Sequence, residues 1–229
     1  MKSFVASLLA AASVQAIEHL SLAEFKYLSL QERKSSKSNF SPISMEVDGK
    51  VGTYYVAAGF ASSGSSDYKV PAEGRGYIST TASLDKKNPS YFKPNLLGGS
   101  VEWDVDLSEH ECGCIAAFYL VSMPGKDEAG DLWMSTDGWG YCDANQVAGN
   151  FCPEFDLMEA NKYSLATTPH ACNSPDSKGF YHDCDGDGHC NMNIYEMLDW
   201  NGYGAGDSYT INTDLPFHVK VSFEKDEDG

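Results

Sequence analysis

The stretch Val101-Glu102-Trp103-Asp104-Val105-Asp106-Leu107 decides the class of fold, because its apolar and acidic residues alternate without interruption. Successive side chains of a β-strand point to opposite faces of a sheet. A period of two therefore predicts a strand with one buried face and one polar face.

The same kind of pattern recurs on both sides of this strand. Residues 217–223 alternate between apolar and polar, 54–56 and 77–81 are rich in β-forming residues, and 115–121 are continuously apolar, which is typical of a strand buried on both faces. Turns rich in Gly and Pro separate these segments. The pattern predicts an all-β fold in which antiparallel strands form a β-sandwich over residues 39–229.

The N-terminal region differs from this pattern. Residues 1–16 have a basic start, an apolar run too short to span a bilayer and a small-residue cleavage site, which predicts a signal peptide and a secreted protein. In residues 17–38, apolar side chains recur at roughly helical spacing ahead of a polar run. This favours an amphipathic helix and linker, either a pro-segment or a helix docked on the main domain.

The net charge of −17 bears on the partners of the protein. An acidic surface repels nucleic acid and anionic membranes and suits a neutral polymer, although it also simply favours solubility. Asp183-Cys184-Asp185-Gly186-Asp187-Gly188 resembles half of a calcium loop, but Ile194 stands where such a loop needs a bidentate Glu. We expect a hydrogen-bonded turn there, with no metal and no cofactor, and the sequence implies no oligomer.

Three carboxylates, Glu154, Asp156 and Glu159, fall within six residues. A regular strand would point Glu159 away from the other two, but one bulged residue after Asp156 returns it to their face. Two carboxylates roughly 5–5.5 Å apart perform retaining glycoside hydrolysis, in which one attacks the anomeric carbon and the other acts as acid and then base. Asp156 would hydrogen-bond the nucleophile. An acidic edge strand without catalytic function is the alternative.

These residues resemble the Glu-x-Asp-x-x-Glu signature of glycoside hydrolase family 7, the cellobiohydrolases and endoglucanases. Further matching segments keep the order of the family within residues 96–223, namely 96–98, 101–108, 112–113, 117–119, 140–143, 159–161, 168–172, 184–195 and 200–204. The resemblance implies a curved, concanavalin-like jelly roll with a long cleft for a β-1,4-glucan such as cellulose.

The resemblance also implies residue roles. Glu154 would be the nucleophile, Asp156 its supporting acid, Glu159 the acid/base, and His170 would lie on the leaving-group side. Tyr119, Tyr141 and Asp143 would line sugar sites. Cys142 with Cys152, and Cys172 with Cys184, match positions that form disulfides. Trp133 and Trp139 are candidate sugar platforms by residue type alone, since a flat ring packs on the apolar face of glucose, and a place in the core is the more common alternative for each.

Two departures from the family qualify this picture. The segment between Asp143 and Cys152 is short, and residues 179–182 lack the expected arginine. Both favour an open cleft and endo cleavage. The alternatives are a β-1,3(4)-glucanase resembling glycoside hydrolase family 16 and a non-catalytic carbohydrate-binding wall protein on the same fold.

The odd number of cysteines suggests that the chain is the N-terminal half of its domain. The family domain is roughly twice this length, and the resemblance implies that Cys112 and Cys190 pair with residues of the later half, while Cys114 has no match. The alternative is a complete short protein in which Cys190 pairs with Cys112 or Cys114.

Overall fold

The computed structural model of the chain describes residues 19–26, 40–57, 74–83, 85, 89–131, 139–147 and 149–226. Within these ranges the regular structure is almost entirely β, as predicted, and the helix α1 (Ile194–Met197) is a single turn. No helix in the described ranges is long and apolar enough to cross a membrane. The signal peptide predicted for residues 1–16 lies outside the described residues.

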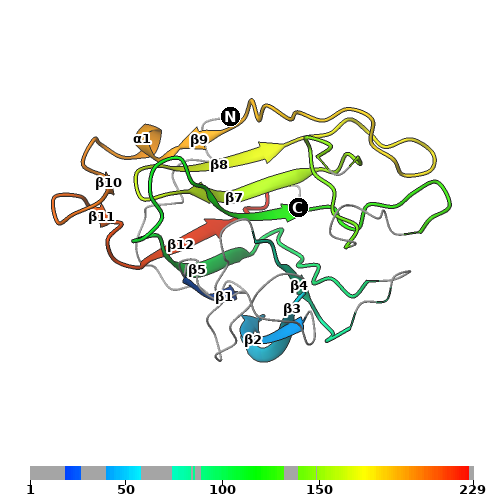
Figure 1. The fold of residues 1–229 in the computed structure, drawn as a ribbon, viewed down its shortest axis with the longest axis horizontal. Coiled ribbons are helices and arrows are strands. Elements are labelled where there is room, and N and C mark those ends of the chain that lie inside the picture. The colour runs from blue at the N-terminus through cyan, green and yellow to red at the C-terminus, as the bar shows by residue number, and fades with distance from the viewer. Residues whose placement is uncertain are drawn as a thin grey trace. The chain divides into compact units, whose positions relative to one another are not determined.

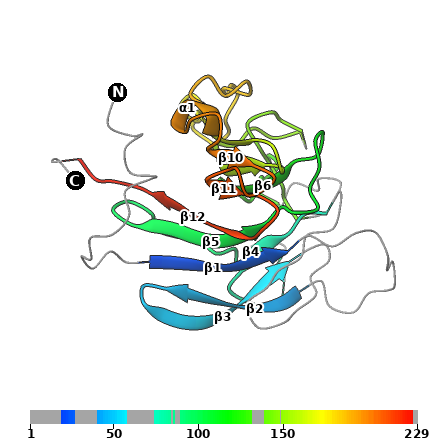
Figure 2. The same cartoon turned by 90° about the vertical axis from the view of Figure 1, so that its left-hand side faces the viewer.

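The chain divides into two compact units, and in the sequence most of the second unit is inserted between two segments of the first. Unit 1 contains residues 1–83, 91–109 and 214–229, and unit 2 contains 84–90 and 110–213. The sheet of unit 1 has the strand order β12-β5-β1-β2-β3-β4 (Figure 2). Its strands are β1 (His19–Lys26), β2 (Phe40–Val47), β3 (Lys50–Ala57), β4 (Tyr77–Ser79), β5 (Ser100–Asp106) and β12 (Phe217–Ser222).

Strand β5 confirms the alternation read from the sequence. Val101, Trp103 and Val105 are buried, and the acidic residues between them pair with the neighbouring strand β12. Lys220 Nζ lies 2.7 Å from Glu102 Oε1, and His218 Nδ1 lies 2.9 Å from Asp104 Oδ1. One face of the pair therefore belongs to the core, while the other carries cross-strand charge pairs.

The prediction of an amphipathic helix within residues 17–38 is wrong for His19–Lys26, which form strand β1. This strand pairs in parallel with β5 and antiparallel with β2, and its register shifts between Leu22 and Phe25. The spacing of Leu20, Leu22 and Phe25 fits a strand with one irregularity as well as a helix, and pairing on both edges satisfies the backbone. Residues 27–38 of the predicted segment lie outside the described ranges.

Unit 2 contains a sheet in the order β6-β7-β8-β9 and a small parallel pair, β10 with β11. Figure 1 shows β7 and β8 side by side, with α1, β10 and β11 near the end of the sheet where β8 begins. The strands are β6 (Ala116–Val121), β7 (Glu154–Ala160), β8 (Leu165–His170), β9 (Met192–Asn193), β10 (Tyr203–Gly204) and β11 (Ile211–Asn212).

The prediction that residues 115–121 are buried on both faces is wrong. Ile115 is 66% exposed, Ala117 is also exposed, and the rest of β6 is half-buried. The reason is that β6 is the edge strand of its sheet within the described chain and carries one wall of an open cavity. A continuous apolar run does not by itself distinguish such a strand from a central one.

Two buried side chains, Tyr203 and Thr213, anchor the turn between β7 and β8. Tyr203 Oη donates to the carbonyl of Asn161 at 2.7 Å, and Thr213 Oγ1 donates to the carbonyl of Lys162 at 2.7 Å. Tyr203 and Thr213 are fully buried. The side chain of Asn161 accepts from the backbone amides of Tyr163 and Ser164. The turn therefore holds Tyr163 in a defined place at the end of the sheet.

Candidate active site

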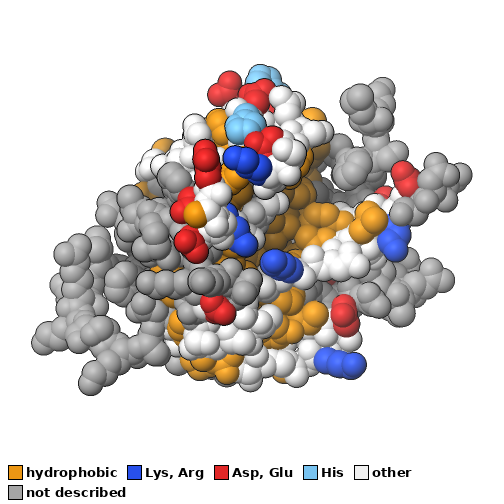
Figure 3. Space-filling view, turned by 90° about the vertical axis from the view of Figure 1, so that its right-hand side faces the viewer, with side chains coloured by type: hydrophobic (Ala, Val, Ile, Leu, Met, Phe, Trp, Pro, Cys, Tyr) orange, Lys and Arg blue, Asp and Glu red, His pale blue; other side chains and the backbone are white. Residues whose placement is uncertain are grey.

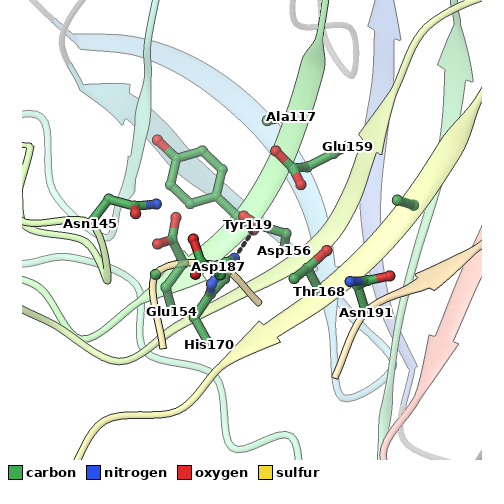
Figure 4. A pocket seen from close by; sticks show the side chains of 12 residues that line it. Ala117, Tyr119, Asn145, Glu154, Asp156, Glu159, Thr168, His170, Asp187 and Asn191 are labelled. Atoms are coloured by element: carbon green, nitrogen blue, oxygen red, sulfur yellow. Dashed lines mark hydrogen bonds and ion pairs between the residues drawn. The ribbon is translucent and has the colours of Figure 1, made fainter. Parts of the chain in front are cut away.

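A bulge in β7 brings the three carboxylates to one cavity. The register with β6 passes from Phe118 opposite Met158 to Tyr119 opposite Asp156, and the register with β8 shifts over the same residues. Leu157, the extra residue, is 1% exposed. The predicted bulge is thus confirmed, and Glu154, Asp156 and Glu159 face the same space (Figure 4).

The cavity measures about 410 Å³ and draws its walls from three strands and two loops. It is lined by Ala117, Tyr119, Asn145, Glu154, Asp156, Glu159, Ala166, Thr168, His170, Gly186, Asp187 and Asn191. Most of these side chains are polar, and Tyr119 contributes an aromatic ring. The cavity therefore offers hydrogen-bond partners on several sides of a bound molecule.

Glu154 is held by the loop that precedes its strand. The backbone amide of Ala144 donates to Glu154 Oε2 at 3.0 Å. Asp143 builds this loop, because its Oδ1 accepts from the amides of Asn145 and Val147. The disulfide between Cys142 and Cys152 ties the ends of the loop together, which by loop-closure entropy stabilises the fold by about 2–3 kcal/mol.

Burial raises the pKa of Glu154, and the charges of Asp143 and Glu159 act in the same direction. The Ala144 amide and His170 oppose this rise in the pKa. A carboxylate with one oriented donor and a raised pKa is a stronger base and nucleophile than a solvated one.

Asp156 and His170 form a buried pair, with Asp156 Oδ2 and His170 Nε2 2.9 Å apart. His170 Nδ1 lies 2.7 Å from the carbonyl oxygen of Asp185. A carbonyl only accepts, so Nδ1 carries a proton and donates it to Asp185. The contact between Nε2 and Asp156 then needs a further proton, which resides on one of the two groups.

The pKa values of the pair follow from this arrangement. Burial raises the pKa of Asp156 to about 7, with contributions from the charges of Glu154 and Glu159, against the opposing hydrogen bond from His170. Burial lowers the pKa of His170, but its hydrogen bonds to the Asp185 carbonyl and to Asp156 outweigh this effect and raise it. The pair therefore keeps its shared proton in mildly acidic solution and contributes no net charge beside Glu154.

The turn after β8 holds His170 from the other side. Gly188 has a φ of +66°, and a Cβ there would lie 2.3 Å from Thr168 Cγ2 and 2.9 Å from His170 Cε1. Asp185 accepts from the amides of Gly188 and His189, so this segment is a hydrogen-bonded turn. Cys172 and Cys184 form a disulfide at its base, one of the two pairs that the resemblance implies.

Around this turn, histidines and carboxylates mix at the surface. His189 Nδ1 lies 2.6 Å from Asp185 Oδ1, and His182 Nε2 lies 3.0 Å from Asp176 Oδ2. Figure 3 shows histidine and acidic side chains gathered together on one face of the molecule. The backbone carbonyl of Asp185 accepts both from His170 Nδ1 and from the amide of Gly188.

The other predicted site residues differ in their positions. Tyr119 lines the cavity, whereas Trp139, Tyr141 and Asp143 are buried and do not line it. The interpretation of Trp139, Tyr141 and Asp143 as sugar-contacting residues stays a prediction. In the structure, Asp143 organises the loop behind Glu154. Trp133 lies outside the described residues.

Sequence reasoning missed several polar residues of the cavity wall, among them Asn145, Asp187 and Asn191. Each follows a cysteine by one to three residues, Cys142 for Asn145, Cys184 for Asp187 and Cys190 for Asn191, and that position was the available signal. Cys112, Cys114 and Cys190 are free and exposed.

Comparison with known proteins relates the chain to one family. Residues 145–229 match the family model described as glycosyl hydrolase family 7. Endoglucanase EG-1 of Humicola insolens is 30% identical over 174 residues, which cover 64% of this chain and 38% of that protein. The probable endo-beta-1,4-glucanase celB of Aspergillus clavatus is 33% identical over 160 residues, covering 61% of this chain and 38% of that protein.

A solved structure supports the fold. The cellobiohydrolase of Daphnia pulex, a member of the same family, aligns with a TM-score of 0.58 at 21% identity, covering 88% of this chain and 68% of that one. This likeness confirms the predicted β-sandwich class. The chain spans about two fifths of the length of the curated relatives it matches.

The pKa of Asp156 predicts how stability depends on pH. Because the folded protein holds this proton more tightly than the unfolded chain, Asp156 favours folding at low pH. That contribution is lost as the pH rises from 3.8 to about 7. The amide of Asp156→Asn still donates to His170 Nε2 but does not titrate. Over this pH range the free energy of unfolding of the variant should therefore fall by on the order of 2–4 kcal/mol less than that of the wild-type protein.

Urea unfolding midpoints measured at intervals between pH 4 and 8 would give these slopes. The exposed carboxylate of Asp199 provides the matched control, since Asp199→Asn should keep the wild-type slope. Parallel curves for Asp156→Asn and the wild-type protein would contradict the assignment of the proton.

Proposed function

We propose that this chain, a divergent relative of glycosyl hydrolase family 7, hydrolyses β-1,4-linked glucan with retention of anomeric configuration and by endo attack. The observation that carries the proposal is the bulged strand β7, which directs Glu154, Asp156 and Glu159 into one cavity. Neighbouring carboxylates on one strand suit a double displacement through a glycosyl-enzyme intermediate.

In the proposed reaction Glu154 attacks the anomeric carbon, and Glu159 donates its proton to the departing glycosidic oxygen. Water then attacks the glycosyl ester, Glu159 takes the proton of that water, and Glu154 leaves as a carboxylate. Ala144 N–H supports the carboxylate form of Glu154 at the start and end of the cycle. The Asp156–His170 pair, neutral while it keeps its proton, limits the negative charge that the attacking group must tolerate.

The substrate assignment rests on the cavity and on the relatives. The cavity wall joins the ring of Tyr119 to amide, hydroxyl and carboxyl groups, which suits an uncharged sugar with apolar faces and many hydroxyls. The matched proteins carry the names endoglucanase and endo-beta-1,4-glucanase, and the matches do not favour family 16. A short loop between Asp143 and Cys152 favours a cleft open to internal stretches of a polymer.

Substitution of the two glutamates tests the catalytic assignment. Glu154→Gln and Glu159→Gln each remove a group that the chemistry needs, so each should reduce hydrolysis of a soluble β-glucan by at least about 100-fold. Asp156→Asn should cost less, because it touches the reaction through His170 and Glu154. Reducing-sugar release by the purified proteins measures the effect.

The exposed Glu196 is the matched control, and Glu196→Gln should retain wild-type turnover. Turnover close to wild type in Glu154→Gln or Glu159→Gln would refute the role of that glutamate in the reaction. Wild-type protein that binds glucan and releases no sugar would favour the non-catalytic alternative.

The stereochemistry of the first product tests the mechanism. Two displacements at the anomeric carbon restore its configuration, so the product formed first should be the β-anomer. Proton NMR recorded within the first minutes of cleavage of a cello-oligosaccharide distinguishes this anomer before mutarotation. An initial α-anomer would mean a single displacement by water.

The mode of attack has its own signature in solution. If the cleft accepts internal stretches of the chain, the viscosity of carboxymethylcellulose should fall early, when few reducing ends have formed. Viscometry and reducing-sugar release followed in the same sample give the comparison. Steady release of short sugars at nearly constant viscosity would indicate attack from chain ends.

A further inference from the structure

Unit 2 exposes three aromatic side chains, Tyr163, Tyr195 and Trp200, which we call the aromatic platform. Trp200 is 87% exposed, and the two tyrosines are 43% (Tyr195) and 42% (Tyr163) exposed. Large aromatic residues usually bury most of their surface, so an indole this open to solvent points to a partner. The platform lies outside the cavity wall.

The platform is held in place by its own contacts. Tyr195 Oη donates to the carbonyl of Tyr163 at 2.5 Å, and Tyr163 Oη donates to Glu111 Oε2 at 2.8 Å. The rings of Tyr195 and Trp200 have centroids 6.0 Å apart and planes inclined by 42°. Because both hydroxyls are engaged within the protein, a ligand meets ring surface that is already oriented, which reduces the entropy cost of binding.

The platform begins where the cavity wall ends. Ala166, on β8, and Asn191, just before β9, line the cavity. The two strands pair through Ala166 and Asn193. Asn193 Nδ2 donates to Ser164 Oγ, and Asn193 Oδ1 accepts from the amide of Tyr195. In Figure 1 this is the end of the sheet near α1.

We propose that the aromatic platform binds a single β-glucan chain as a second binding surface beside the cavity. The identity of the ligand rests on the proposed function. The carboxylate of Glu111, which accepts from Tyr163 Oη, is balanced by Lys162, whose Nζ lies 3.6 Å from Glu111 Oε1. The platform therefore suits an uncharged ligand with apolar faces for stacking. Three side chains are too small a patch for a stable protein partner, which needs about 800 Å² on each side.

The inclination of the rings selects the form of the glucan. Two rings inclined by 42° do not lie flat together on a planar surface, so the platform does not suit the face of crystalline cellulose. A separate chain turns its successive sugar faces relative to one another and contacts both rings. The platform therefore selects soluble or amorphous chains.

Binding of neutral hydroxyethylcellulose, measured by native affinity electrophoresis, tests the proposal. The measurement uses Glu154→Gln protein, so that the polymer is not cleaved. Adding Trp200→Ala should weaken the apparent Kd by about 2- to 12-fold, the effect of losing about 0.5–1.5 kcal/mol of stacking. Leu215→Ala, which removes an exposed apolar side chain elsewhere, should leave the Kd unchanged.

Three results would overturn the proposal. They are an unchanged Kd in Trp200→Ala, an equal loss in the Leu215→Ala control, and a loss seen only on microcrystalline cellulose. With Glu154 intact, Trp200→Ala should cleave a chromogenic cellobioside at the wild-type rate, since this short substrate occupies only the cavity. Protein that shows Trp200-dependent binding but no cleavage would refute the proposed function and retain the platform. Cleavage without Trp200-dependent binding would do the reverse.

Discussion

One extra residue in β7 determines what the rest of the site can do. Leu157 is buried beneath the strand, so the backbone bulges and Glu159 returns to the face that Glu154 and Asp156 already occupy. Burying an apolar side chain of this size stabilises the fold by about 1.5–3 kcal/mol. The packing of the core therefore secures the register on which three converging carboxylates depend.

Convergent carboxylates repel one another, and hydrogen bonds at Glu154 and Asp156 reduce this repulsion. The carbonyl of Asp185 determines which nitrogen of His170 is always protonated, and this leaves the other nitrogen to share a proton with Asp156. The loop built by Asp143 supplies an amide to Glu154. Each acid thus has a different environment although all three lie on one strand, which is how neighbouring carboxylates acquire different roles.

The sequence predicted strand positions and the bulge because both depend on a local period of two, as in Val101–Val105 and Glu154–Glu159. It failed where two structures share one spacing. Leu20, Leu22 and Phe25 fit a helix or an irregular strand, and only the pairing with β5 distinguishes them. The run 115–121 likewise does not reveal that β6 is an edge strand. Cavity residues such as Asn191 come together through loop conformation, which has no periodic signature.

The order of segments in the two units has a consequence for folding kinetics. Strands β5 and β12 pair with each other, with Trp103 opposite Val219, although residues 110–213 of unit 2 separate them in the sequence. During synthesis the contacts of unit 2 become available while the last strand of unit 1 is still inside the ribosome. The carboxylate strand and its two disulfide loops can therefore form first, and the sheet of unit 1 closes last, at the slower rate that long-range strand pairing imposes.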